Sequence, residues 1–545
     1  MKTAALNSLI QVKSRYFLKR ASSLLGAAFV IPFLAGARDQ PQWGEAWSRN
    51  MVSHEISLPD SFDPKTGLNV KWTAKLGTES HSTPIVSGGR VYIGTNNGEP
   101  RDPKHRGDRG VLMCFDERDG SLLWQLVVPK REEDPYHDWP KTGISSPVTV
   151  EGDRVYLVDN RGVVLCLDAR GLANGNDGPF RDEGAYLTPR GTNAPAQPVQ
   201  PGPLDADILW ACDLTREAGI WSHDAAHSSI LIHGEQLYLN SGTGVDNTHK
   251  RIRTPDAPSL IVLDKRTGRL LARDEEHIAP DIFHCTWSSP SLGEVNGRPL
   301  VFFAAGNGVV YAFEPLGQSV ETLKRPNVEP ASNSTPQLFN ASTAPIATLK
   351  KVWQLDFDPA APKRDIHRYS TNRREGPSNI YGMPVFDGNR IYVAGGGDLF
   401  WGKNEAWLKC IDATKRGDIT TNGLVWTYPL EKHVMSTPVI YQGLVFIADC
   451  GRKFHCLSVS TGRALWTHDL NGEVWASPLV ADGKVYLGTR SGQFLIFAAS
   501  RDKRVLATIE LGNPISATAT AANGVLYVAT MKELFAVSKS VTQQR

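Results

Sequence analysis

Short runs of apolar residues that recur about every 40 residues dominate the pattern along this chain. The clearest copy has four runs separated by glycine-containing turns, at 436–440, 443–447, 453–457 and 462–466. Four short strands joined by tight turns predict one antiparallel meander. The pattern starts again at Ser477, which lies 41 residues after Ser436, and a period of this length is typical of a four-stranded propeller blade.

Other parts of the chain repeat the same order of runs, which gives eight copies in all. Their first strands begin near residues 82, 145, 228, 288, 382, 436, 477 and 516. Because one blade cannot bury both of its faces, such units stack side by side around a central channel. The sequence therefore predicts an all-β fold, an eight-bladed β-propeller of four-stranded antiparallel blades.

The eighth copy lacks its fourth strand. It stops at residues 534–537 with no Gly-x-x-x-Trp segment behind it, whereas an unpaired strand that contains Trp72 precedes the first copy. We therefore expect the N-terminal strand to complete the eighth blade and to close the ring. This closure would also remove a free sheet edge, which is otherwise an aggregation risk.

The first 37 residues differ from the rest of the chain. Five basic residues precede an apolar run over 21–37, which has no acidic residue and ends in Ala35-Gly36-Ala37. This order is typical of a cleaved export signal, and the run is short for a membrane span. We expect a signal peptide at 1–37, an irregular leader at 38–67 that lies across the outside of the ring, and the propeller at 68–540. The expected location is periplasmic or extracellular; an uncleaved anchor is the alternative, and the export route stays open between the general and the twin-arginine pathway.

The length and the charge narrow the function classes. Eight blades need only about 320 residues, so the remaining length is expected in insertions, at 96–110, 129–142, 171–207, 242–258, 314–350, 359–380 and 395–406. The formal net charge is +2, and most of it comes from the basic N-terminal segment. Such a near-neutral chain has no electrostatic footprint for nucleic acid.

Seven cysteines in an exported chain raise the question of disulfides. Four of them occupy the same slot of the third strand in separate copies, namely Cys114, Cys166, Cys410 and Cys456. Equivalent slots in different blades are not disulfide neighbours, and the slot takes a small apolar side chain. The cysteines are therefore expected to be structural.

The strand end Gly-x-x-x-Trp appears at Gly120–Trp124 and Gly462–Trp466, together with Val-Tyr second strands and Leu-Asp third-strand ends. Over residues 68–540 these features resemble the tryptophan-docked propellers of the pyrroloquinoline quinone (PQQ)-like repeat superfamily. The resemblance implies two branches. Quinoprotein dehydrogenases hold PQQ and calcium over the channel with an Asp base, calcium-ligating Glu and Asn, and a pair of adjacent cysteines, whereas the other branch binds proteins. This chain has no adjacent cysteines and no Cys-x-x-Cys-His for a fused haem.

Residues just before each first strand are expected at the mouth of the channel, where this superfamily places its ligand. The candidate funnel residues are His81, His223, Asp224, His227, His284, Trp287, Asn379, Tyr381, His433 and Trp475. Histidines are common transition-metal ligands, and aromatic rings can stack on flat ligands. If the funnel binds a ligand or metal, His81, His227, His284 and Trp287 should converge on one side of it. The alternative is a wet channel in which these side chains bond to local backbone.

Two functions follow from these observations. The first is an exported binding or scaffold protein, a monomeric ring of unknown ligand, that holds a partner protein or an extracellular polymer on its insertion-rich face. The alternative is a quinoprotein-type oxidoreductase, similar to alcohol and sugar dehydrogenases, that binds PQQ or a metal in the funnel. No cofactor is required by the first function, and PQQ is the cofactor of the second. Neither function involves nucleic acid or a membrane span after signal cleavage.

Overall fold

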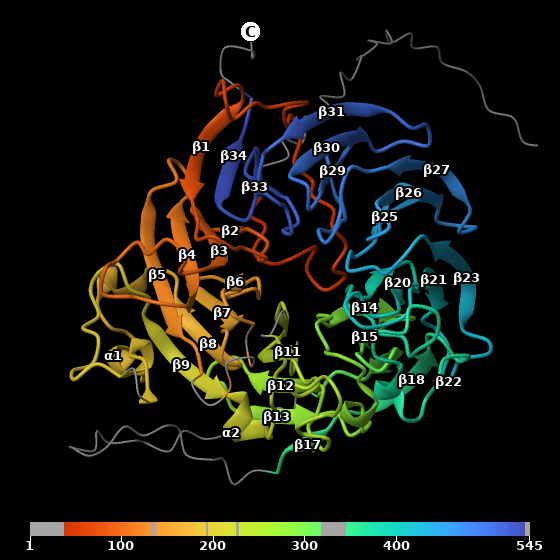
Figure 1. The fold of residues 1–545 in the computed structure, drawn as a ribbon, viewed down its shortest axis with the longest axis horizontal. Coiled ribbons are helices and arrows are strands. Elements are labelled where there is room, and N and C mark those ends of the chain that lie inside the picture. Colours follow the sequence, from red (N-terminus) through yellow and green to blue (C-terminus); the bar gives the residue numbers. More distant parts are fainter. Residues whose placement is uncertain are drawn as a thin grey trace, which may run out of the picture. The chain divides into compact units, whose positions relative to one another are not determined.

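The computed structural model describes residues 38–131, 134, 137, 139–191, 194–224, 228–317 and 345–539. These residues form eight antiparallel sheets, which follow one another around a ring (Figure 1). Each sheet places the first strand of its copy innermost, and the second and third strands follow outward in chain order. The prediction of an eight-bladed all-β propeller is confirmed.

The blades are numbered in chain order. Blades 1 to 4 contain β2 (Ile85–Ser87), β3 (Arg90–Asn96), β4 (Arg109–Asp116) and β5 (Leu122–Pro129); β6 (Thr149–Glu151), β7 (Arg154–Val158), β8 (Val163–Asp168) and β9 (Ile208–Asp213); β10 (Leu231–His233), β11 (Gln236–Asn240), β12 (Leu260–Asp264) and β13 (Leu270–Arg273); and β14 (Ser291–Val295), β15 (Arg298–Ala304), β16 (Val309–Phe313) and β18 (Lys351–Asp356). Two short strands add to blades 3 and 4 in parallel, β17 (Ala347–Thr348) and β22 (Gly417–Asp418).

Blades 5 to 8 repeat this arrangement with shorter connections in blades 6 and 7. They contain β19 (Val385–Asp387), β20 (Arg390–Gly396), β21 (Ala406–Asp412) and β23 (Leu424–Leu430); β24 (Val439–Tyr441), β25 (Leu444–Ala448), β26 (Lys453–Ser458) and β27 (Ala464–Asp469); β28 (Leu479–Ala481), β29 (Lys484–Gly488), β30 (Gln493–Ala498) and β31 (Val505–Glu510); and β32 (Thr520–Ala522), β33 (Val525–Ala529), β34 (Glu533–Val537) and β1 (Val70–Lys75).

Helices are short and lie in the connections. They are α1 (Glu183–Leu187) and α2 (Leu214–Ala218), with 3-10 turns η1 (Gly171–Asn174), η3 (Ala279–Asp281) and η4 (Ile366–Tyr369). Within the described ranges, no helix has both the length and the apolar character needed to cross a membrane.

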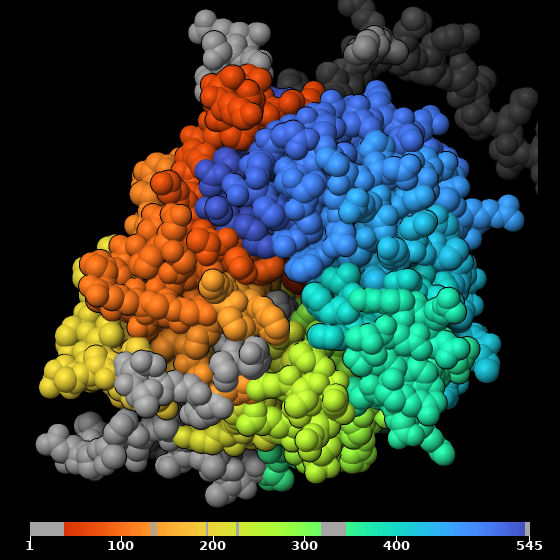
Figure 2. Space-filling model, viewed as in Figure 1, coloured from red at the N-terminus to blue at the C-terminus, as the bar shows by residue number. Residues whose placement is uncertain are grey.

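The N-terminal strand closes the ring as the sequence predicts. Strand β1 pairs antiparallel with β34, so that Trp72 lies opposite Ala536 and Ala74 lies opposite Leu534. Figure 2 shows the red N-terminal residues and the blue C-terminal blade packed side by side. Blade 8 is thus built from both ends of the propeller chain, and its fourth strand has no separate copy in the C-terminal sequence.

The Gly-x-x-x-Trp motif joins neighbouring blades. The indole Nε1 of a fourth-strand tryptophan donates to a backbone carbonyl oxygen of the next blade over 2.9–3.2 Å, in the pairs Trp72–Glu117, Trp124–Ala169, Trp210–Lys265, Trp353–Ala413, Trp426–Val459 and Trp466–Ser500. The motif glycine of the next blade lies under the ring: a Cβ on Gly120 would be 2.7 Å from the indole of Trp72. Because the glycine has no side chain, it leaves a flat surface on which the tryptophan of the preceding blade packs.

The leader does not lie across the outside of the ring, and that expectation was wrong. Segment 40–53 runs through the centre (red in Figure 1) and hydrogen-bonds to one residue of the innermost strand of each blade in turn, namely Val86, Val150, Ile232, Leu292, Phe386, Ile440, Val480 and Ala521. The physical reason is that innermost strands turn a free edge toward the channel. Buried N–H and C=O groups on such an edge need partners.

Arg49 fixes the leader to blades 3 and 4. Its side chain is fully buried, with 0% exposure. Its guanidinium donates to the carbonyl oxygens of Ser229 at 2.8 Å, Pro290 at 3.0 Å and Trp43 at 3.1 Å. A guanidinium carries five N–H donors in a fixed fork, so one side chain can satisfy several carbonyl groups where two blades and the leader meet.

The cysteines occupy the predicted positions. Cys114, Cys166, Cys410 and Cys456 lie on the third strands β4, β8, β21 and β26. All seven cysteines are buried free thiols. Burial raises the pKa of the Cys166 thiol to about 12, so this side chain packs as a small neutral group.

Candidate functional site

A pocket of about 560 Å³ lies where the connections before the innermost strands converge. Trp43 of the leader is among its lining residues. Because segment 40–53 fills the channel beside the innermost strands, it closes the pocket on that side. The central channel is therefore a blind cavity of a size that suits a small molecule.

Aromatic rings form a large part of the wall of this pocket. Five tryptophans line it, Trp43, Trp139, Trp287, Trp401 and Trp475, together with Tyr381 and Phe400. The rings also contact one another: the centroids of Trp287 and Tyr381 are 4.7 Å apart, and those of Phe400 and Trp475 are 6.2 Å apart. Such mutual packing holds the ring planes in place before any ligand enters.

The structure brings most of the predicted funnel residues to this pocket. The ones that line it are His81, Asp224, His284, Trp287, Tyr381 and Trp475. His223, Asn379 and His433 are buried outside the lining. Asn379 donates from Nδ2 to the carbonyl oxygen of Cys285 at 3.1 Å, and His433 Nε2 lies 3.4 Å from Arg373 Nη1, so both support loops. His227 lies outside the described residues.

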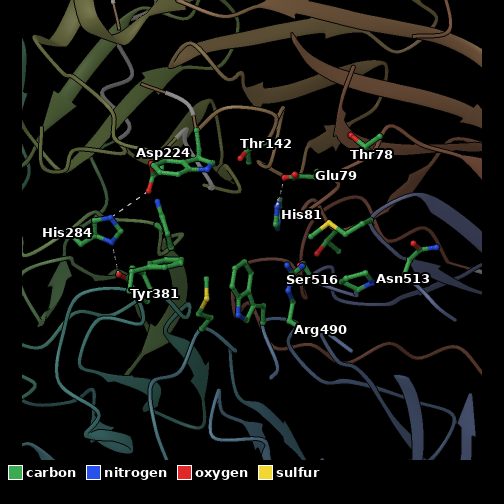
Figure 3. A pocket seen from close by; sticks show the side chains of 18 of the residues that line it. Thr78, Glu79, His81, Thr142, Asp224, His284, Tyr381, Arg490, Asn513 and Ser516 are labelled. Atoms are coloured by element: carbon green, nitrogen blue, oxygen red, sulfur yellow. Dashed lines mark hydrogen bonds and ion pairs between the residues drawn. The ribbon is translucent and has the colours of Figure 1, made fainter. Parts of the chain in front are cut away.

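The polar groups form two walls. Figure 3 shows Asp224, His284 and Tyr381 on one side of the pocket, and Glu79, His81 and Arg490 on the other. The expectation that His81 and His284 share one side of the funnel is therefore wrong. The reason is that His81 precedes blade 1 and His284 precedes blade 4. These two blades lie on different sides of the ring axis, so the pocket separates the two histidines.

The wall that contains Arg490 combines a cation with an aromatic ring. The Arg490 guanidinium lies 4.3 Å from the ring centroid of Trp475 and donates to Ser516 Oγ at 2.5 Å. His81 stacks on Trp475, with centroids 5.9 Å apart. A hydrogen bond from His81 lowers the pKa of Glu79, and burial lowers the pKa of Arg490 while Glu79 opposes that change. We call Glu79, His81, Trp475, Arg490 and Ser516 the arginine wall.

The opposite wall is formed in part by three neighbouring histidines, which we call the histidine cluster: His249 and His284, which line the pocket, and His223, which is buried next to them. One ring nitrogen from each lies within 4.8 Å of the others. The Nε2 atoms of His223 and His284 are 3.1 Å apart. Asp224 Oδ2 lies 3.3 Å from His223 Nε2 and 3.6 Å from His284 Nε2. Three imidazoles and a carboxylate thus point at one place beside the pocket.

Asp398 orients this cluster from behind. Its Oδ2 lies 2.9 Å from His284 Nδ1 and accepts a hydrogen bond from the Tyr381 hydroxyl. Its Oδ1 accepts the backbone N–H groups of Phe400 and Trp401. Burial opposes the charge on both partners, but their ion pair outweighs it, so the pKa of Asp398 is lowered and the pKa of His284 is raised.

The loops that carry the cluster are held close together. Val245 N donates to the carbonyl oxygen of His284 at 2.8 Å, which joins the β11–β12 loop to the link before β14. A Cβ on Gly244 would lie 2.6 Å from that oxygen and 2.7 Å from His223 Cβ, so only glycine fits between the two histidines. Asp224 and His249 both have left-handed backbone, with φ of 57° and 56°. Packing from three loops maintains these unfavourable conformations.

Reading the slot before each first strand missed several of these residues. His249 comes from the insertion at 242–258, and Asp398, Phe400 and Trp401 come from the insertion at 395–406. Arg490 follows β29, and Trp43 comes from the leader. The available signal was the length and aromatic content of the two insertions, since an insertion on a propeller connection lies over an end of the channel.

A family model described as outer membrane protein assembly factor BamB matches residues 107–172 and 404–506. No curated protein matches the sequence. Among solved structures, a europium-containing methanol dehydrogenase is 12% identical with a TM-score of 0.53, and the match covers 90% of this chain and 89% of that chain. BamB from Moraxella catarrhalis is 11% identical with a TM-score of 0.49, covering 87% and 98%. The computationally designed Ika8 protein is 10% identical with a TM-score of 0.49, covering 86% and 100%.

At this level of identity the likeness to the methanol dehydrogenase concerns the fold. The family match falls on blades 1 and 2 and on blades 5 to 7, and the tryptophan docking extends the same repeat to other blades. The chain is a PQQ-like repeat β-propeller.

Proposed function

We propose that this protein binds a flat, ring-bearing small molecule with an acidic group in the blind pocket. The observation that carries the proposal is the set of five tryptophans around a 560 Å³ cavity that the leader closes on one side. Tryptophan faces bury large apolar area with little loss of side-chain entropy, and they stack on flat ligands. A cavity that held only water would gain no binding energy from such an aromatic wall.

The arginine wall supports the acidic group of this ligand. Arg490 lies against the face of Trp475 with its guanidinium at the edge of the cavity, and Lys532 also lines the pocket. A ring that stacks on the aromatic wall would bring its substituents toward these cations. Charge-assisted hydrogen bonds from a guanidinium to a carboxylate are about twice as strong as neutral ones.

PQQ, which the resemblance implies, matches this description of the ligand, but the calcium that accompanies it in the quinoprotein dehydrogenases does not match the pocket. PQQ is flat and anionic, so it suits the aromatic rings and Arg490. The calcium of the quinoprotein dehydrogenases needs several oxygen ligands. The two acids that line the pocket, Glu79 and Asp224, lie on opposite walls (Figure 3). The residues therefore do not fit the calcium-dependent site, and no oxidoreductase step follows from them.

The test uses PQQ as a flat anionic probe, with and without Ca²⁺. Saturable quenching of tryptophan fluorescence and a higher melting temperature are expected, because a ligand that binds only the native state stabilises it. Neither effect should depend on Ca²⁺. Replacing Trp475 with Ala should weaken binding about fivefold or more, since one lost aromatic contact is worth about 1 kcal/mol or more.

Trp47→Ala is the matched control, because this leader tryptophan is 49% exposed and does not line the pocket. Binding in that variant should equal wild type. A melting-temperature rise with a neutral disaccharide and none with PQQ would show that the acidic group is wrongly assigned. If neither compound changes fluorescence or melting temperature, the proposal fails. The expected export and the expected protein or polymer partner stay predictions.

A further inference from the structure

We propose that His223, Asp224, His249 and His284 bind one divalent transition-metal ion in the wall of the pocket. This inference goes beyond the proposed ligand binding, because it concerns a separate set of donors on the side away from Arg490 (Figure 3). His223 and His284 are almost completely buried, at 2% exposure each, and their Nε2 atoms face each other.

The distances between donor atoms match those of ligands that share one ion. His223 Nε2, His284 Nε2 and Asp224 Oδ2 form a triangle with sides of 3.1, 3.3 and 3.6 Å. Two nitrogens bound to one tetrahedral Zn²⁺ at about 2.0–2.1 Å are about 3.3 Å apart. His249 supplies a third imidazole within 4.8 Å of the other two. The three imidazoles therefore lie around a position that a single small cation would fill, and the Asp224 carboxylate lies beside two of them.

The partner of His284 is the one that a metal-bound imidazole usually has. Its Nδ1 faces Asp398 Oδ2 at 2.9 Å, which leaves Nε2 directed at His223. A carboxylate behind a ligating histidine fixes the tautomer and raises the basicity of the ligand nitrogen. Asp398 is itself held by the backbone N–H groups of Phe400 and Trp401 and by Tyr381. Asp398 is thus a positioning residue for the proposed site.

The donor set selects the kind of ion. Imidazole nitrogens suit Zn²⁺, Cu²⁺, Ni²⁺ and Fe²⁺, whereas Ca²⁺ and Mg²⁺ require oxygen ligands. Asp224, His249 and His284 also line the pocket, so the ion would face the cavity between them. A water molecule or an oxygen atom of a bound ligand can reach the ion from that side. The ion would then anchor a ligand opposite the arginine wall.

The competing explanation is a hydrogen-bonded cluster without metal. In that case His223 donates from Nε2 to His284, and Asp224 accepts from the same group. Metal titration separates the two explanations. The full chain is treated with a chelator, dialysed, and titrated with Zn²⁺ and with Co²⁺ by calorimetry, with metal content measured by elemental mass spectrometry. One ion per chain is expected, and excess Ca²⁺ should not compete.

Bound Co²⁺ should give the intense visible absorption of a four-coordinate site, and azide that adds to the ion from the cavity side should change that spectrum. His249→Ala is the first variant, because His249 is only half-buried and its loss is tolerated more easily than that of His284. It should weaken Zn²⁺ binding about 100-fold or more, and Asp398→Asn should weaken it about 10–100-fold, the usual effect of a changed outer partner.

His433→Ala is the control, since His433 is buried and outside the cluster, next to Arg373. It should bind Zn²⁺ as wild type does. Circular dichroism and the melting temperature of each variant verify that the ring is folded. Absence of Zn²⁺ binding in the wild-type chain, or equal affinity in His249→Ala and wild type, would overturn the proposal. Failure of the PQQ test would leave the metal proposal standing, because the PQQ test uses no transition metal and adds only Ca²⁺.

Discussion

The indole Nε1 of Trp124 donates a 2.9 Å hydrogen bond to the carbonyl oxygen of Ala169, which belongs to the next blade. The same ring covers Gly171, where an added Cβ would lie 2.8 Å from Trp124 Cγ. One side chain thus provides both an apolar contact and a directional bond across the junction. The interface between the two blades is specified by these two features together.

Replacing Trp124 with Ala should lower the free energy of unfolding by about 3–5 kcal/mol, the range for deleting a large buried aromatic ring. The side chain is only 1% exposed. Trp124→Phe keeps a ring but loses the hydrogen bond to Ala169. Its free energy of unfolding should therefore lie between those of wild type and Trp124→Ala, with the lost bond alone lowering it by about 1 kcal/mol. Chemical denaturation gives all three values. A loss below about 1 kcal/mol in the Ala variant would contradict the buried junction.

Two glycines of blade 6 separate backbone strain from docking. Gly462 and Gly443 both have left-handed backbone, with φ of 67° and 78°. A Cβ on Gly462 would meet the indole of Trp426 at 2.5 Å, whereas a Cβ on Gly443 would meet nothing within 4 Å. Gly462→Ala should therefore cost about 1–3 kcal/mol more than Gly443→Ala, the usual cost of overpacking. Equal melting temperatures for the two variants would show that the ring of Trp426 does not need the glycine.

The sequence predicted those features that repeat. Gly462 and Trp466 recur with fixed spacing, and each copy buries the same face, so the blades and the closing role of Trp72 follow from periodicity. The leader has no period, and most of its contacts use backbone groups, which leave no pattern in the sequence. The same reasoning found His284 and Trp287 but missed His249, because an insertion has a conformation of its own.

Arg49→Ala should destabilise the protein by about 3 kcal/mol or more, because the buried carbonyl groups of Ser229, Pro290 and Trp43 lose their donor. Arg118→Ala is the matched control. Its side chain is 84% exposed and pairs with Asp116 at the surface, so its loss should cost about 1 kcal/mol or less. Thermal and chemical unfolding measure both, and a similar small loss in the two variants would contradict the anchoring role of Arg49.

Asp207 should make stability depend on mildly acidic pH. Burial raises its pKa to about 6, and its Oδ2 accepts a hydrogen bond from the Asp177 N–H at 2.8 Å. Between about pH 4 and pH 6 the folded protein therefore holds a proton that the unfolded chain, with an aspartate pKa of about 4, has released. Stability due to this group is greatest below pH 4 and falls as pH rises to 6.

Replacing Asp207 with Asn should remove this part of the pH dependence, so that the unfolding free energy of the variant falls less than that of wild type between pH 4 and pH 6. Asp153→Asn, on an exposed turn of blade 2, is the control and should follow the wild-type profile. Denaturant midpoints across this pH range measure the difference. A profile for Asp207→Asn that is parallel to wild type would show that Asp207 is not the titrating group.

Two deletions distinguish the leader from the closing strand. Removing residues 38–69 leaves β1 in place, and should open the pocket and lower the melting temperature while the chain stays monomeric. Removing residues 38–75 also takes β1 and exposes the edge of β34, so aggregation and loss of cooperative unfolding are expected. Light scattering and calorimetry distinguish the two. A monomeric chain with unchanged unfolding after the larger deletion would contradict the closure by β1.

The central position of the leader also bears on the order in which the fold can be completed. Segment 40–53 is synthesised before every blade that it contacts, and its last partner, Ala521 in β32, is made near the end of the chain. Until then the leader carries backbone and arginine donors whose acceptors do not yet exist. Repeat proteins usually gain stability one neighbour at a time. Here one early segment forms a hydrogen bond with the innermost strand of every blade. A ring that lacked a blade would therefore leave a hydrogen-bonding group of the leader without its partner at the ring axis.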